Sequence, residues 1–160
     1  MRHFRLPLGA ASQDFLDRYG TPKTITDLEK LPAVAYTSAG LLLDKFKYTG
    51  KDSSEAHLQL NVNYRVNDLE MLTHAALTGG VLAVVTAQMI EDEVLDGKLI
   101  PIMTQLDLVD WGIFYVVYPH RDPPIKTVLF IEILKNIIGE KPPVWETKIP
   151  GFDNMYGHTK

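Results

Sequence analysis

Runs of apolar residues and one alternating pattern predict a series of β-strands. Residues 32–37 and 81–85 are almost continuously apolar, which is typical of strands buried on both faces, and the first is expected to be central. Residues 56–66 alternate between apolar and polar side chains, which predicts one strand with a single buried face. Residues 38–54 are interpreted as a loop or an edge hairpin. Further strands are predicted over residues 5–11, 99–103 and 112–118, the second at a sheet edge because of Pro101.

Capping residues and apolar residues at helical spacing predict helices between these strands. Ser12 is expected to cap a helix that Gly20 ends, and Asn67 to cap a helix that begins at Asp68 and stops at Gly79. The other helical segments are a single turn over residues 24–29, a helix over 88–95 and a last helix over 124–138. Strands and helices that alternate in this way favour an α/β fold with one largely central mixed sheet flanked by helices.

Composition and charge narrow the classes of function. The chain has 160 residues, enough for one globular domain, and it has no cysteine, which excludes disulfide scaffolds and cysteine-based zinc sites. A net charge of −4 argues against direct nucleic-acid binding. No apolar run is long enough to span a bilayer, and the first residues lack the features of a secretory signal. We therefore expect a cytoplasmic protein with no membrane partner.

Few residues point to catalysis. Ser38 follows a predicted buried strand, but the sequence around it lacks the first glycine of a nucleophile elbow. The five histidines do not have the spacing of metal ligands. We therefore expect no enzymatic activity, no metal and no cofactor. A serine hydrolase that uses Ser38 with His57 or His74 is the alternative.

Polar residues at strand ends and helix starts are the candidate ligand-binding groups. In open α/β sheets, small ligands bind beyond the carboxyl ends of strands and at helix amino ends. Thr37 and Ser38, at the end of the predicted central strand, and Asn67, at a helix start, are the leading candidates. Tyr36 and Thr86 are the next. Ordinary caps and turns would use the same residue types, so the pattern alone leaves both interpretations open.

Four blocks of sequence carry a recognisable pattern. Residues 10–28 are similar to the stretch ASPxYLxxxGxPxxxxDL, and residues 66–79 contain an Asn-Asp start followed by Ala-Ala-Leu-Thr-Gly. Residues 94–101 and 115–134 supply two later blocks in the same order. Together they resemble the effector-binding region of LysR-type transcriptional regulators. Two positions depart from that pattern: Val81 replaces a usual glycine, and Thr86 stands where a proline commonly ends the strand.

The resemblance implies a fold and a function. It implies a type 2 periplasmic-binding-protein-like fold for residues 1–141, with a second subdomain over 10–111 and a strand and helix over 112–139 that complete the first. Residues 142–160 have no counterpart in the family pattern, and their prolines and glycines, without apolar periodicity, predict an extended tail. A small effector would bind between the subdomains and control DNA binding by a helix-turn-helix domain not present in this chain. The five candidate residues would then offer hydroxyl and amide donors to an anionic metabolite.

The last predicted strand and helix also predict association. Residues 112–118 and 128–138 are rich in large apolar side chains, and a monomer rarely exposes a large apolar patch. We expect the chain to self-associate through them, by exchange between protomers, or to fold the helix back onto the subdomain. A truncated interaction protein that pairs with a full-length regulator is the other alternative function.

Overall fold

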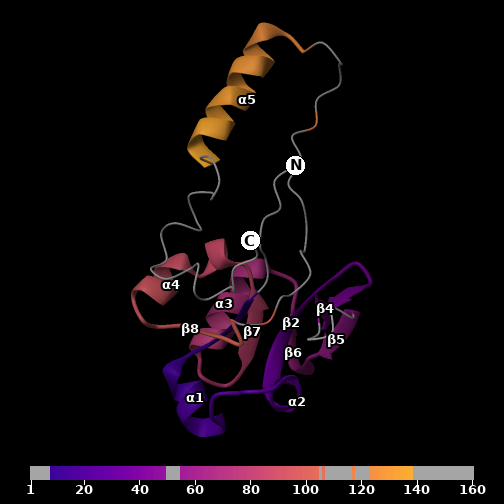
Figure 1. Cartoon of the computed structure of the whole chain (residues 1–160), viewed down its shortest axis with the longest axis vertical. Helices are drawn as coiled ribbons and strands as arrows, with labels where there is room; N and C mark the ends of the chain where they lie inside the picture. The colour runs from indigo at the N-terminus through magenta and orange to yellow at the C-terminus, as the bar shows by residue number, and fades with distance from the viewer. Residues whose placement is uncertain (1–7, 50–54, 105, 107–116, 118–122, 139–160) are drawn as a thin grey trace.

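The computed structural model describes residues 8–49, 55–104, 106, 117 and 123–138 (Figure 1). The predicted strand over residues 112–118, apart from Val117, and the predicted tail over 142–160 lie outside this part of the chain. The elements follow in this order: β1 (Leu8–Ala11), α1 (Gln13–Tyr19), α2 (Ile25–Leu28), β2 (Pro32–Ser38), β3 (Leu41–Leu43), β4 (Lys45–Thr49), β5 (Glu55–Gln59), β6 (Asn61–Val66), α3 (Leu69–Leu77), β7 (Leu82–Val85), the 3₁₀ turn η1 (Ala87–Met89), α4 (Glu91–Leu95), β8 (Ile100–Ile102) and α5 (Ile125–Ile138).

A mixed sheet organises the fold, as the sequence predicts. Its strand order is β3-β2-β7-β1-β8, with β6 also paired to β2. Strands β6 and β7 run parallel to β2, whereas β3 is antiparallel to β2, and β1 is antiparallel to both β7 and β8. The predicted central position of β2 and the edge position of β8, which contains Pro101, are both confirmed.

Both faces of the sheet are buried, because side chains alternate along each central strand. In β7, Ala83 and Val85 belong to one apolar cluster, and Leu82 and Val84 belong to the other. The first cluster is closed by residues of α3 and of the segment after β7, such as Leu72 and Ile90. The second is closed by α1, α2 and the β4–β5 hairpin, through Phe15, Leu28, Phe46 and Leu58. The core is thus a layer on each side of the sheet.

The helix caps follow the sequence closely, with one correction. Ser12 Oγ accepts a hydrogen bond from the Phe15 N–H at 3.3 Å, and Gly20 ends α1 with φ +81°, as predicted. Asn67, however, does not cap α3. Asp68 is the N-cap, and its Oδ1 accepts from the N–H groups of Glu70 and Met71 at 2.8 and 3.2 Å. The helix therefore starts one residue later than the sequence predicted.

The predicted single strand over residues 56–66 is wrong in two respects. It is broken at Leu60 into β5 and β6, and β5 pairs with β4 in a separate two-stranded sheet. Within β6 the register against β2 shifts, since Ala33 pairs with Val62 but Val34 pairs with Tyr64. As a result Val62 and Val66 pack on opposite faces of the sheet, and Tyr64 is exposed.

Two other predicted segments are only partly correct. Residues 38–54 include the β2–β3 hairpin, as one interpretation had it, but also β4. The predicted helix over 88–95 is divided into η1 and α4 at Ile90. The last helix, α5, is where it was predicted, yet none of its residues is buried and it stands apart from the sheet (Figure 1). Among the described helices, none has the length and apolar character to cross a membrane.

Candidate functional site

The candidate site lies at one edge of the mixed sheet, where three parallel strands end together. Strands β2, β6 and β7 are parallel neighbours, so their carboxyl ends meet at the same edge. Tyr36 pairs with Val66, and Val34 pairs with Ala83, three residues before Thr86. This is the place at which open α/β sheets bind ligands.

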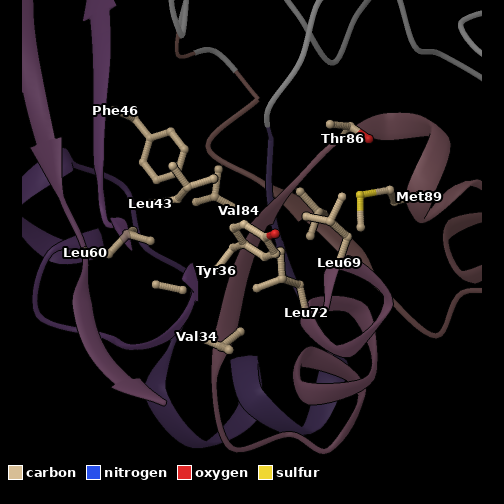
Figure 2. A pocket seen from close by; sticks show the side chains of 12 residues that line it. Val34, Tyr36, Leu43, Phe46, Leu60, Leu69, Leu72, Val84, Thr86 and Met89 are labelled. Carbon is tan, nitrogen blue, oxygen red and sulfur yellow. The ribbon is translucent and has the colours of Figure 1, made fainter. Parts of the chain in front are cut away.

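A cavity of about 300 Å³ opens at this edge. Figure 2 shows Tyr36 between two apolar walls: Leu43, Phe46 and Leu60 on one side, and Leu69, Leu72 and Met89 on the other. The first wall comes from β3, β4 and the β5–β6 junction, and the second from α3 and η1. Among the residues that the structure describes, the lining is Val34, Ala35, Tyr36, Leu43, Phe46, Leu60, Leu69, Leu72, Val84, Val85, Thr86 and Met89.

The polar groups of this cavity are two hydroxyls. Thr86 Oγ1 is buried and has no hydrogen-bond partner among the described residues. Thr86 is also the N-cap of η1, but its side chain makes no capping hydrogen bond. Tyr36 supplies the second hydroxyl (Figure 2). Since a buried hydroxyl without a partner is destabilising, Thr86 is a group that a bound ligand would satisfy.

Ionic groups lie away from the cavity. In the part of the chain that the structure describes, no Asp, Glu, Lys, Arg or His lines it. The pKa of Asp27 is lowered, chiefly by the Thr24 hydroxyl and also by the Lys23 N–H, within the capping box of α2. The pKa of Lys98 is raised by its hydrogen bond to Asp96, beyond the end of α4. Neither shift acts on a group in the cavity.

The structure divides the five predicted site residues into two groups. Tyr36 and Thr86 line the cavity. Thr37 and Ser38 do not: the Thr37 hydroxyl donates to the Leu41 carbonyl at 3.0 Å within the β2–β3 hairpin, and Ser38 is exposed beside the turn. Asn67 is also exposed, just before the N-cap of α3. All five lie at the same sheet edge, but only Tyr36 and Thr86 line the cavity.

The sequence did not single out the apolar lining. Phe46, from the separate β4–β5 sheet, reaches the cavity only because the chain folds back after Leu43. Leu69 gave a weak signal, since it is a large apolar residue in the first turn of a helix and is half exposed. A large apolar residue directly after the N-cap of a helix, at a strand-to-helix junction, is therefore the sign that the sequence offered.

The serine hydrolase alternative gains no support from this geometry. His57 lies on β5 in the second sheet. His74 lies on α3, where its Nδ1 donates to the Glu70 carbonyl at 2.9 Å if the ring is neutral. Within the described part of the chain, no hydrogen bond joins Ser38 to either histidine. The geometry thus holds no assembled nucleophile and base around Ser38.

Comparison with known proteins gives a consistent family. The sequence matches the family model of the LysR substrate binding domain over residues 5–137, whereas no curated protein sequence matches it. The structure resembles the regulatory domain of AphB from Vibrio vulnificus, treated with cumene hydroperoxide, with a TM-score of 0.60, 20% identity, and coverage of 79% of this chain and 61% of that one.

Two longer structures are also similar. CrgA, a LysR-type transcriptional regulator from Neisseria meningitidis, gives a TM-score of 0.55 at 18% identity, over 69% of this chain and 37% of that one. Full-length AphB, a virulence activator from Vibrio cholerae, gives 0.56 at 15% identity, over 68% of this chain and 37% of that one. The chain thus spans less than two thirds of each structure. The likeness confirms the predicted α/β fold.

Proposed function

Because the chain belongs to the LysR substrate binding domain family, we propose that it is the effector-binding part of a LysR-type transcriptional regulator. A small molecule held at the carboxyl edge of β2, β6 and β7 would control DNA binding by a helix-turn-helix domain outside these 160 residues. Such a regulator would act in the cytoplasm. The observation that carries the proposal is the apolar cavity at this edge, with the unpartnered Thr86 hydroxyl at its rim.

The lining favours an effector that is largely apolar and uncharged. A pocket of this kind binds through apolar contact, and a few polar groups fix the orientation of the ligand. Thr86 and Tyr36 can each donate or accept a hydrogen bond, but none of the described lining residues is cationic and could pair with an anion. At the nearby start of α3, the Asp68 carboxylate already occupies two N–H groups. These features support a neutral ligand over the anionic metabolite expected from sequence.

The ligand class can be tested with two probes of similar shape. Benzyl alcohol is neutral and carries one hydroxyl, whereas benzoate carries a negative charge. We expect benzyl alcohol to bind more tightly to the 160-residue chain, with NMR chemical-shift changes centred on Tyr36, Thr86 and Met89. Tighter binding of benzoate, or shifts centred away from these residues, would contradict the assignment of the site.

A matched pair of variants tests the role of the Thr86 hydroxyl. Thr86→Val removes the buried, unpartnered hydroxyl of a residue that lines the cavity, and should weaken benzyl alcohol binding about fivefold, the effect of one hydrogen bond. Thr37→Val removes a hydroxyl at the same sheet edge that does not line the cavity, so it should leave binding unchanged. Equal effects of the two substitutions on the dissociation constant would show that Thr86 does not contact the probe.

A further inference from the structure

A second cavity lies beside the first, between α3 and the segment that follows β7. It measures about 350 Å³ and is lined by Glu70, Thr73, His74, Gln88, Met89 and Glu93. Met89 also lines the cavity of the candidate site, so one side chain contributes to both cavities. Apart from Met89, every lining residue of the second cavity is polar or ionisable.

The lining presents two buried polar oxygens, both able to accept a hydrogen bond, that have no partner among the described residues. Thr73 Oγ1 and Gln88 Oε1 are buried and have no partner among the described residues. Thr73 is only 5% exposed, although it lines the cavity. An unpartnered acceptor in such a place indicates a missing donor.

The other lining groups add to this acceptor character. Glu70 and Glu93 contribute carboxylates, which only accept hydrogen bonds when ionised. In neutral His74, Nδ1 donates to the Glu70 carbonyl, so Nε2 is left as an acceptor. Lys98 lies close enough to Glu93 to feel its charge, but its ammonium group pairs with Asp96 at 2.7 Å. Among the described residues, no lysine or arginine lines the cavity.

We infer that this cavity binds a small organic cation with an ammonium group. The N–H donors would satisfy Thr73 and Gln88, the two carboxylates would balance the positive charge, and Met89 would contact the alkyl part. A metal ion fits less well, since no group of three His, Asp or Glu side chains in the described part of the chain is arranged to hold one. Apart from Met89, the residues that support this inference are not those that line the candidate effector site.

Three small probes distinguish this site from general attraction to an acidic surface. n-Butylammonium carries both the charge and the N–H donors, tetramethylammonium carries the charge alone, and n-butanol carries neither the charge nor the ammonium donors. We expect only n-butylammonium to give saturable NMR shifts at Thr73 and Gln88 in the full chain. Similar shifts with tetramethylammonium, or no saturation with n-butylammonium, would overturn the inference.

Paired substitutions locate the binding on the cavity. Glu93→Gln and Asp92→Asn change the net charge equally and lie next to each other on α4, but only Glu93 lines the cavity. We expect Glu93→Gln and Thr73→Val each to weaken n-butylammonium binding about fivefold or more, and Asp92→Asn to change it less than about twofold. Equal losses in Glu93→Gln and Asp92→Asn would overturn the inference. So would unchanged binding in Thr73→Val, provided that thermal unfolding shows this variant to be folded.

Discussion

At the scale of single residues, partners already present decide which polar side chains remain available. Thr37 and Thr86 are both hydroxyl residues at the end of a buried strand, and their local sequences do not rank them. The Thr37 hydroxyl is used by the Leu41 carbonyl across a tight hairpin, whereas the Thr86 hydroxyl is left without a partner. The sequence could therefore predict the sheet edge as the site, but not which hydroxyl faces the cavity.

The turn of the β2–β3 hairpin, whose Leu41 carbonyl accepts from Thr37, holds an alanine in a disfavoured backbone conformation. Its two turn residues, Ala39 and Gly40, both have positive φ, at +45° and +86°, which is the conformation of a type I′ turn. Glycine adopts it freely, but alanine is disfavoured there and asparagine is preferred. We expect Ala39→Asn to raise the free energy of unfolding by about 0.5–1 kcal/mol, measured by urea denaturation. Ala39→Val should lower it, and a less stable Asn variant would contradict this description of the turn.

At the scale of elements, the sequence predicts where regular structure occurs better than where it ends. The alternation over residues 56–66 is real, but a strand that leaves one sheet for another keeps the same period. The break is set by distant groups: the Leu60 N–H donates to the Asp44 carbonyl at 2.8 Å, and the Gln59 N–H donates to Glu29 Oε1 at 3.0 Å. No local pattern contains these contacts.

The sequence likewise predicts the start of α3 only to within one residue. Asn67 and Asp68 are both good N-cap residues, so their sequence cannot decide between them. Burial decides, because Leu72 and Ala76 must face the core. The four blocks of sequence that carry the family resemblance could be recognised in advance. The one-residue offset, which moves Asn67 out of the capping position, could not.

Because Asp68 and not Asn67 caps α3, we expect Asp68→Ala and Asn67→Ala to differ in their effect on stability. Asp68→Ala removes an oxygen that accepts from two backbone N–H groups, and should lower the free energy of unfolding by about 1 kcal/mol. Asn67→Ala, at an exposed position outside the helix, should change it by no more than about 0.5 kcal/mol. Chemical denaturation of both variants measures the difference. A larger loss in Asn67→Ala would restore Asn67 as the cap.

At the scale of the whole molecule, the sheet and its two apolar layers form the core without help from α5. Of the residues that the structure describes, twenty-three apolar ones from Leu8 to Ile102 are buried, and none of them lies on α5. The helix nevertheless exposes Ile125, Leu129, Phe130, Ile133 and Ile137. Of the two outcomes predicted from sequence, folding back onto the subdomain gains no support, since no residue of α5 is buried. Association through α5 stays a prediction.

Association through α5 is expected because an apolar helix in water is costly. Burying a large apolar side chain contributes roughly 1.5–3 kcal/mol, so a few residues of α5 suffice to hold two chains together. Light scattering of the purified chain should therefore give a mass above that of the 18.0 kDa monomer. Ile133→Glu should shift the chain toward monomer without changing the unfolding temperature of the sheet.

Asn136→Glu adds the same charge at an exposed polar position of the same helix, so it should leave the mass unchanged. A wild-type chain that stays monomeric at high concentration, or equal dissociation in both variants, would show that α5 does not hold the chains together.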